Sequence, residues 1–257
     1  MLVAEIHGHF VPEALGSEDY LTSAVFGHLR YLPASLFWAD LFASALNLPA
    51  ENLTAVLTNK GIDFRLFDSV TMYFWPSHPK YGIPDCLICF SGSRQKAIAI
   101  LIEAKLTATK SGTGEQDQLA RYMKLLDEDD GFGGRLPAGC ESFVVYLTDH
   151  DSTAEIEESI GACSHPDDAR HRMFHLSWQD IIIASEKAHA SGLQGLILSD
   201  VAAFLRSRGL EYFKGFSNSQ IPELRPELGR FYGGFAFGQL PLPQDFTVRR
   251  GEWVHGQ

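Results

Sequence analysis

The stretch AIAILIEAK, residues 97–105, decides the fold, because an unbroken apolar run ends in a carboxylate and an ammonium side chain. Such a run predicts a strand that is buried on both faces. Side chains two positions apart share one face of a strand, so we expect Glu103 and Lys105 to lie side by side. Because unpaired charge is costly to bury, this pair at the end of a core strand indicates a built site.

A second carboxylate lies upstream, where Pro84-Asp85 precedes the short apolar segment 86–90. A turn separates this segment from the predicted strand at 97–105, so the two are expected to pair as neighbouring strands. Asp85 and Glu103 would then converge with Lys105. Carboxylates together with a main-chain carbonyl are the oxygen ligands that Mg²⁺ prefers, and the lysine would orient or deprotonate an attacking water.

The pattern Asp85…Glu103-Ala104-Lys105 resembles the signature of the PD-(D/E)xK phosphodiesterase superfamily, the fold of many restriction and repair nucleases. Its context resembles the core of that family as well, because three predicted strands precede a helix. These elements are expected at 64–75 (as 64–70 and 73–75), 85–90, 97–105 and 117–126. The resemblance covers residues 15–150. It implies an α/β fold in which a mixed central β-sheet is flanked by helices, as in a restriction-endonuclease-like core.

Two further motifs match the same superfamily. Gln118 and Tyr122 match the Gln-x-x-x-Tyr motif of a helicase-associated and exonuclease-like branch, and their i, i+4 spacing places them on one helix face. Upstream, Ser17 is expected to cap a helix in which Glu18 lies in line with the apolar stripe. The family often places an acidic residue of its first helix in the metal site, and Glu18 matches that role.

The resemblance implies a Mg²⁺-dependent nuclease, a hydrolase of phosphodiester bonds in which Mn²⁺ substitutes for Mg²⁺. Nucleic acid is the implied partner, with DNA favoured over RNA, and a role in bacterial restriction or antiviral defence is the implied setting. The implied catalytic residues are Asp85, Glu103 and Lys105, the implied metal ligands are Glu18, Asp85, Glu103 and the carbonyl of Ala104, and the implied substrate-binding residues are Gln118 and Tyr122.

Each of these residues also has a non-catalytic interpretation. Asp85 after a proline is typical of a turn or cap, and Glu103 with Lys105 is also the pattern of a solvated ion pair on an edge strand. Glu18 favours a helix N-terminus through the helix dipole, and Tyr122 suits a packed core position. The alternative function is therefore a non-catalytic binding subunit that keeps a nuclease-like fold.

Composition and charge bound the remaining choices. The 257-residue chain carries a net charge of −11, which argues against tight non-specific binding of nucleic acid, although residues 61–126 alone hold eight Lys or Arg and six Asp or Glu. A partner that supplies part of the DNA binding would reconcile the two observations. Long apolar runs and a signal-peptide pattern are lacking, and four cysteines are too few for a disulfide framework, so we expect a cytoplasmic, non-membrane protein.

The predicted domain organisation is a nuclease-like domain at 1–210 followed by an appendage at 211–257. In the appendage, aromatic residues and arginines are interleaved among Pro and Gly. Aromatic side chains with arginine can stack on single-stranded bases, but such a segment more often packs on the core or on a partner. A homo-oligomer and a partner subunit both stay open.

The remaining pattern predicts helices at 17–31, 35–47, 180–190 and 193–210, and strands at 141–148 and 173–178. The glycine-bearing loop 110–114 precedes the helix of Gln118. A helix N-terminus behind such a loop can receive a phosphate, and the other interpretation is an ordinary strand-to-helix turn. The sequence contains no Walker A loop, G-x-S-x-G elbow or H-E-x-x-H motif.

Overall fold

The computed structural model describes residues 17–106, 108–127 and 133–211, and within these residues a five-stranded sheet is the central element. Its strands lie in chain order. The first strand pairs antiparallel with the second, and the second with the third. The third strand pairs parallel with the fourth, and the fourth with the fifth. The strands are β1 (Ser69–Phe74), β2 (Cys86–Ser91), β3 (Ile98–Ala104), β4 (Glu141–Thr148) and β5 (Met173–Ser177). The predicted fold class, an α/β protein with a mixed central sheet flanked by helices, is confirmed.

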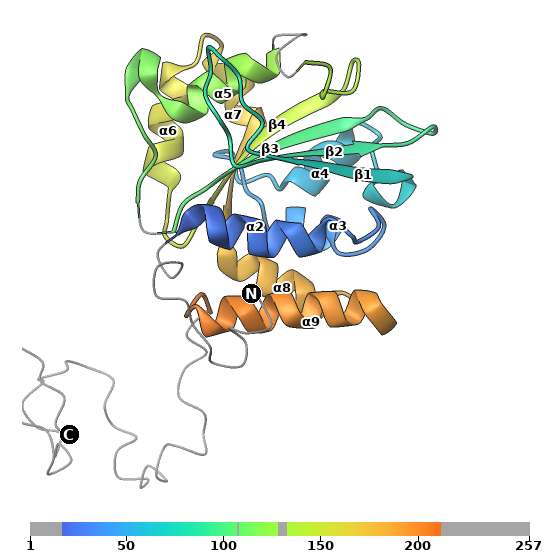
Figure 1. Ribbon diagram of the computed structural model, residues 1–257. Coiled ribbons are helices and arrows are strands. Elements are labelled where there is room, and N and C mark those ends of the chain that lie inside the picture. Colours follow the sequence, from blue (N-terminus) through green and yellow to red (C-terminus); the bar gives the residue numbers. More distant parts are fainter. Residues whose placement is uncertain (1–16, 107, 128–132, 212–257) are drawn as a thin grey trace, which may run out of the picture. The chain divides into compact units, whose positions relative to one another are not determined.

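One face of the sheet is covered by helices from both ends of the described chain (Figure 1). Ile88 of β2 and Ile100 of β3 point into the core on this side, where Trp38 and Trp178 are fully buried. The helices that contribute to this core are α2 (Glu18–Leu29), α3 (Trp38–Phe42), α4 (Leu53–Asn59), α8 (Trp178–Lys187) and α9 (Gly192–Ser207).

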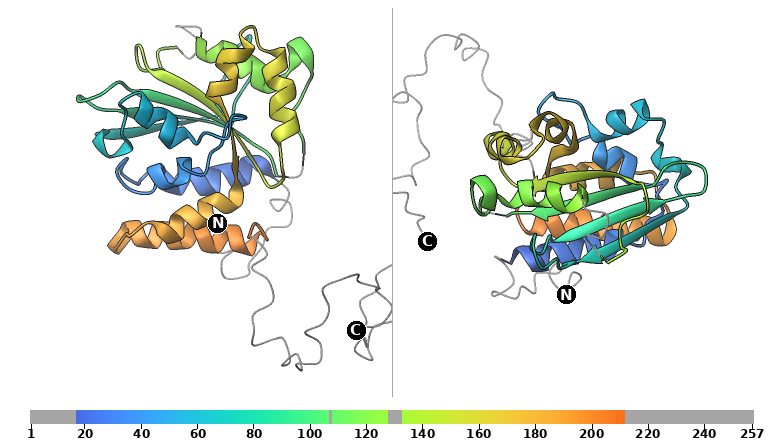
Figure 2. Two further views of the ribbon diagram at one scale, coloured as in Figure 1. Left: turned by 180° about the vertical axis from the view of Figure 1, so that it is seen from behind. Right: turned by 90° about the horizontal axis from the view of Figure 1, so that it is seen from above.

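The opposite face carries the helices from the middle of the chain, as the views from behind and above show (Figure 2). Leu87 and Leu101 pack there with Tyr122 in a second core. Its helices are α5 (Gln118–Asp127), α6 (Thr153–Ala162) and α7 (Pro166–Arg172). Since β3 lies between the two cores, each of its residues is buried, as its apolar sequence predicts.

The first predicted strand is only half right. Residues 64–66 form a short 3₁₀ helix, η2 (Phe64–Leu66), because the Asp63 carboxylate accepts a hydrogen bond from Arg65 N at 2.9 Å and starts a turn. One continuous strand, β1, then replaces the two predicted pieces 64–70 and 73–75. Trp75 lies just beyond β1 and has a positive φ of 46°.

The second predicted helix, 35–47, is also too long, because only α3 is helical in this region. Leu46 N donates to His175 O at 2.9 Å and His175 N donates to Leu46 O at 2.8 Å, so this segment is extended and pairs beside β5. The other predicted strands agree with β2 to β5 to within a residue, and the predicted helices agree with α2, α5, α8 and α9 to within about three residues. Helices α4, α6 and α7 were not predicted.

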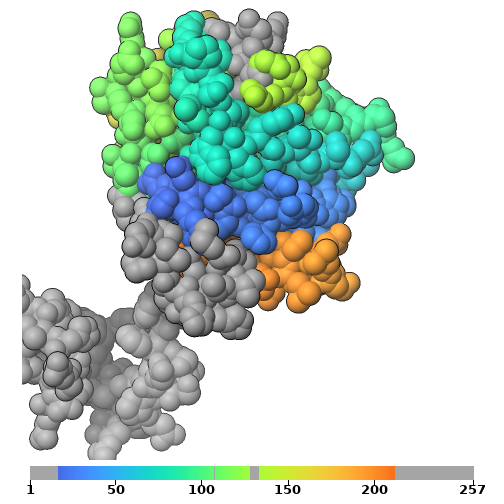
Figure 3. Space-filling view, in the orientation of Figure 1, coloured from blue at the N-terminus to red at the C-terminus, as the bar shows by residue number. Residues whose placement is uncertain are grey.

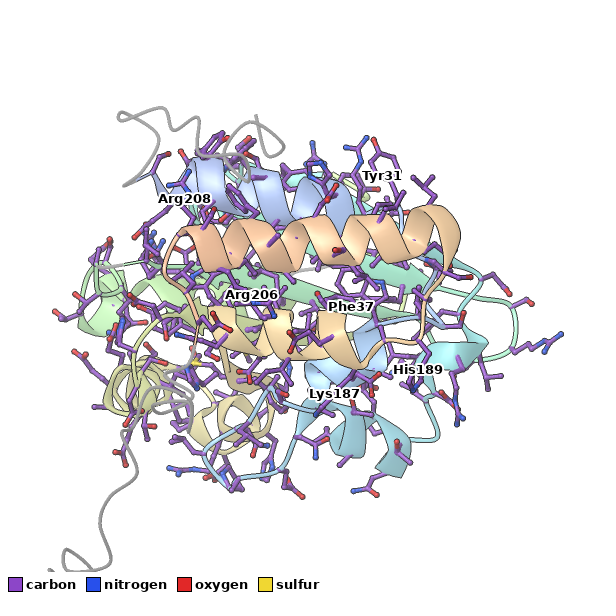
Figure 4. All side chains as sticks on the ribbon, turned by 90° about the horizontal axis from the view of Figure 1, so that it is seen from below. Tyr31, Phe37, Lys187, His189, Arg206 and Arg208 are labelled. Carbon is purple, nitrogen blue, oxygen red and sulfur yellow. The ribbon has the colours of Figure 1, made fainter. Side chains whose placement is uncertain are left out.

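The described chain ends in a pair of packed helices. Figure 4 shows α8 and α9 side by side, and Arg206 of α9 pairs there with Glu186 of α8. In the described ranges, no helix is long and apolar enough to cross a membrane. The chain divides into two units, Met1–Tyr212 and Phe213–Gln257. The predicted aromatic appendage at 211–257 lies, apart from its first residue, outside the described residues.

Candidate active site

Glu103 and Lys105 meet at the end of β3, as their spacing predicts. The Lys105 ammonium lies 2.7 Å from Glu103 Oε1, and both side chains are largely buried, at 12% and 2% exposure. Lys105 follows the last residue of the strand, and its main-chain nitrogen donates to Leu147 O of β4 at 2.8 Å. In the next peptide group, the carbonyl of Lys105 accepts a hydrogen bond from the indole nitrogen of Trp178 at 3.0 Å. The backbone at the lysine is therefore fixed from both sides.

Asp85 reaches the same strand end from β2. Because β2 and β3 are antiparallel, with Cys86 opposite Ile102, the start of one strand lies beside the end of the other. Asp85 Oδ2 accepts a hydrogen bond from the main-chain nitrogen of Ala104 at 2.8 Å, and the residue is only 8% exposed. Ala104 therefore contacts Asp85 through its main-chain nitrogen. The role of the Ala104 carbonyl as a metal ligand stays a prediction.

Glu18 enters from the first turn of α2. Ser17 caps this helix by accepting a hydrogen bond from Tyr20 N at 3.1 Å. Glu18 Oε2 lies 3.3 Å from the Lys105 ammonium, and its Oε1 accepts a hydrogen bond from Leu106 N at 3.0 Å. The helix start therefore lies over the end of β3, and Glu18 shares the lysine with Glu103.

Gln118 and Tyr122 complete the cluster from α5. Gln118 Nε2 donates to Glu103 Oε1 at 2.7 Å and to the Tyr122 hydroxyl at 3.0 Å. The Tyr122 hydroxyl donates in turn to the carbonyl of Ile83 at 3.2 Å, and its ring is buried in the second core. The core interpretation of the Tyr122 ring is confirmed, its hydroxyl joins the polar cluster, and its role in substrate binding stays a prediction.

A neighbouring ion pair, Lys110 with Asp117, fixes α5 in place and was not predicted. Asp117 is fully buried, caps α5 through a 3.0 Å hydrogen bond from Ala120 N, and pairs with the Lys110 ammonium. Ser159 Oγ donates to the same carboxylate at 3.1 Å. Asp117 after a glycine-bearing loop is a capping signal that could have indicated part of this arrangement.

The loop before α5 is an ordinary strand-to-helix turn rather than a phosphate cradle. The carboxylate of Asp117 already accepts the hydrogen bond from Ala120 N, and Gln118 N donates to Ser111 O, so these main-chain donors at the helix N-terminus are taken. Gly112 has a φ of +74°, and a Cβ there would lie 2.1 Å from the carbonyl of Gln116, so the turn requires glycine.

Burial and mutual repulsion perturb the carboxyl groups of the cluster. Burial raises the pKa of Asp85 to about 6, although the Ala104 hydrogen bond and Lys105 oppose the change. Burial, and then the charge of Asp85, raise the pKa of Glu103 to about 7. Burial lowers the pKa of Lys105, but the neighbouring carboxylates, Glu103 first, outweigh it and leave the pKa above its ordinary value. The cluster therefore holds more negative charge than one lysine balances.

The donor set has the chemistry of a site for a hard divalent cation. Glu103 Oε2 is buried and, among the described residues, has no hydrogen-bond partner, which is costly for a carboxylate oxygen unless a cation binds it. In the ranges that the structure describes, no group of three or more His, Cys, Asp or Glu side chains is arranged to coordinate a metal ion. Mg²⁺ needs no such cage, because it keeps several waters and binds proteins through one or two carboxylates. Asp85 and Glu103 would supply these two carboxylates.

Comparison of the chain with protein-family models, with curated proteins and with solved structures gives no match. The functional argument therefore rests on the geometry of this cluster. Five predicted site side chains form one hydrogen-bonded group at the end of β3, and Asp85, just before β2, joins it through the main-chain nitrogen of Ala104; the five are Glu18, Glu103, Lys105, Gln118 and Tyr122.

Proposed function

We propose that the chain is a Mg²⁺-dependent nuclease that hydrolyses phosphodiester bonds, with DNA favoured over RNA. The observation that carries the proposal is the buried Glu103 carboxylate, which contacts Lys105 and Gln118 at one oxygen and has no partner at the other within the described part of the chain. The order α2, β1, β2, β3, α5, β4, with antiparallel and then parallel pairing, supports the resemblance to the PD-(D/E)xK core.

Asp85 and Glu103, with Glu18 and the Ala104 carbonyl as further ligands, would hold the metal. The bound metal would polarise the scissile phosphate and lower the pKa of the attacking water. Lys105, as an ammonium whose pKa is raised by its carboxylate neighbours, would hold that water in line with phosphorus and offset negative charge in the transition state. Gln118 would fix the orientation of the Glu103 carboxylate. Together these effects must supply on the order of 15 kcal/mol or more of barrier reduction.

The proposal is tested by incubating the purified chain with labelled single- and double-stranded DNA and RNA in Mg²⁺, Mn²⁺ or EDTA. We expect metal-dependent cleavage that Lys105→Ala abolishes without loss of folding. Lys105→Arg should also fail, because a guanidinium is a bulky planar fork and cannot replace a compact ammonium in this largely buried position. Lys96→Ala is the matched control, since Lys96 is half-exposed and pairs with Glu141 at the other end of β3. Wild-type turnover by Lys105→Ala would refute the assigned role.

The alternative is a non-catalytic binding subunit, and one observation favours it. The Lys105 ammonium is already paired with Glu18 and Glu103, so the charges of the cluster partly satisfy each other without a cation. Thermal melting with and without Mn²⁺ separates the two functions. A metal-induced rise in melting temperature that Asp85→Ala removes supports the nuclease, whereas no rise in the wild type supports the binding subunit.

A further inference from the structure

Trp75 lies against the candidate active site through two hydrogen bonds. Its main-chain nitrogen donates to the carbonyl of Asp85 at 3.0 Å, at the end of the β1–β2 hairpin. Its indole nitrogen donates to Asp19 Oδ1 at 3.2 Å, and Asp19 follows Glu18 in the first turn of α2. Figure 3 shows the hairpin (teal) directly against α2 (blue) on one face of the molecule. The indole is therefore held between the two segments that supply Asp85 and Glu18.

The backbone of Trp75 is strained, and core packing does not explain the strain. A φ of +46° is rare for a bulky residue and costs on the order of 1–3 kcal/mol. The residue is 40% exposed, whereas Trp38 and Trp178, the other described tryptophans, are fully buried in the core. A large aromatic ring that is held in a costly conformation and left open to solvent indicates a binding role.

A second apolar side chain borders the same end of the hairpin. Ile83 is 56% exposed and precedes Pro84-Asp85, while its carbonyl accepts the hydrogen bond from Tyr122. Its backbone is thus tied to the candidate site while its side chain faces solvent. Trp75 and Ile83 together give this border of the site an apolar character.

The charges of the site make such a surface necessary for a nucleic-acid substrate. Glu18 and Glu103 pair with the Lys105 ammonium, and two more carboxylates lie beside them, Asp85 on the main-chain nitrogen of Ala104 and Asp19 next to Glu18 in α2. Before a cation binds, this arrangement repels a phosphate backbone. Stacking of a base on an aromatic ring does not depend on charge and supplies affinity for any unpaired base.

We infer that Trp75 stacks on an unpaired base beside the scissile phosphate, so that the substrate is a nucleic acid with an unpaired base at the cleavage position. This inference rests on the proposed nuclease function. A base inside a duplex has both faces covered by its neighbours, so the ring has access to a base only in a single strand or at an unpaired end. The strained backbone of Trp75 then serves to present the ring rather than to bury it.

The test is a binding measurement with Ca²⁺ in place of Mg²⁺, by fluorescence anisotropy. The probes are a labelled oligothymidylate, an abasic strand of the same length and charge, and a blunt duplex. We expect the oligothymidylate to bind most tightly. Trp75→Ala should weaken its binding by at least about fivefold, the factor expected from the loss of one base stack, and should leave the abasic strand unaffected.

Three further variants separate stacking from a structural role. Trp75→Gly accepts the positive φ without strain, so it should melt at or above the temperature of Trp75→Ala yet show the same loss of binding. Trp75→Phe keeps an aromatic face without the hydrogen bond to Asp19 and should retain most of the binding. Tyr31→Ala removes an aromatic residue that is 64% exposed just beyond the other end of α2 (Figure 4), and should change nothing.

The outcomes distinguish this inference from the proposed function. Equal losses on the oligothymidylate and the abasic strand, or no loss in Trp75→Ala, would overturn the stacking role while leaving metal-dependent cleavage untouched. Base-dependent binding without cleavage of any substrate in Mg²⁺ or Mn²⁺ would support the stacking role and count against the nuclease. A wild-type chain that binds no probe would overturn both.

Discussion

The Gln118 side chain donates one hydrogen bond to Glu103, from Nε2 to Oε1 at 2.7 Å. This contact joins α5 to the end of β3. It holds one oxygen of the carboxylate in place and leaves Oε2 directed elsewhere, without a partner among the described residues. A helix residue thereby sets the orientation of a strand residue that is proposed to bind the metal.

Gln118→Ala should lower the rate of cleavage by about tenfold or more, because a freely rotating carboxylate holds a metal less well. The melting temperature should change little, since Gln118 is only half-buried. Gln116→Ala, at an exposed position in η3 (Gly114–Gln116) before the same helix, is the matched control. Steady-state kinetics on both variants decide the question, and equal rates would contradict an orienting role.

Tyr122→Phe separates the hydroxyl from the ring. The variant keeps the core volume but removes the hydrogen bonds to Gln118 and to the carbonyl of Ile83, so we expect slower cleavage and a loss of about 1 kcal/mol in stability. Tyr122→Ala should cost about 3 kcal/mol or more, because it empties a core position. Tyr146→Phe removes another buried hydroxyl, bonded to Glu155 at 2.8 Å, and should retain full activity. Full activity of Tyr122→Phe would leave its hydroxyl without a role.

Asp85→Asn should stabilise the metal-free protein at pH 8. Burial raises the pKa of Asp85 from 3.8 to about 6. The folded state therefore binds more protons than the unfolded state between these values, and stability falls as pH rises through them. A change of about two in pKa corresponds to at most roughly 3 kcal/mol. The amide oxygen can still accept the hydrogen bond from Ala104, so the fold should be kept.

Melting in EDTA from pH 4 to pH 8 measures this effect. The variant should match the wild type near pH 4 and exceed it above pH 6. Asp63→Asn should act in the opposite direction, because its hydrogen bonds with Arg65 lower the pKa of that carboxyl. A variant of Asp85 that melts below the wild type at pH 8 would show that the carboxylate stabilises the metal-free fold.

Binding of Mn²⁺ should strengthen as pH rises from 6 to 8. Burial and the charge of Asp85 raise the pKa of Glu103 to about 7, and a carboxylate binds a metal only after it has lost its proton. Affinity should rise by roughly tenfold per pH unit below this pKa, for each proton released, and level off above it. Titration calorimetry in two buffers of different ionisation enthalpy detects the protons directly. Constant affinity across this range would contradict a role for Glu103 as a ligand.

Lys110→Met should destabilise the protein by about 3–5 kcal/mol, since it leaves the buried Asp117 carboxylate without its cation. The double variant Lys110→Met with Asp117→Asn should recover part of this loss, because no buried charge remains. Lys60→Met removes a half-exposed pair with Glu141 and should cost less than about 1 kcal/mol. Urea denaturation of the wild type, Lys110→Met, Asp117→Asn and the double variant gives the coupling energy of the pair, and a value near zero would contradict a stabilising pair.

The sequence was sufficient to predict the parts of the fold whose patterns are local. The apolar run of β3 predicted a strand buried on both faces, and the polar residues at its end predicted the cluster. The capping signal of Ser17 predicted the start of α2, and an i, i+4 spacing predicted the contact between Gln118 and Tyr122. In each case the side-chain type and the period of one element decide the geometry.

The parts that could not be predicted depend on contacts between distant segments. Leu46 is extended because it pairs with His175, which no local pattern reveals. Lys110 and Asp117 flank a loop, and their burial depends on α6, which supplies Ser159. The positive φ of Trp75 follows from the end of the hairpin and its bond to Asp19. Propensity alone carries no information about any of these.

The hydrogen bond from Trp178 to the carbonyl of Lys105 joins residues 73 positions apart and determines when the site is completed. A nascent chain that has emerged only as far as α5 already contains every predicted site residue, but the peptide that carries the lysine is not yet held by the indole. That support arrives only when β5 and the start of α8 have been synthesised and have joined the sheet. A polypeptide that stalls on the ribosome before this point would therefore carry the proposed catalytic groups without the backbone geometry to use them.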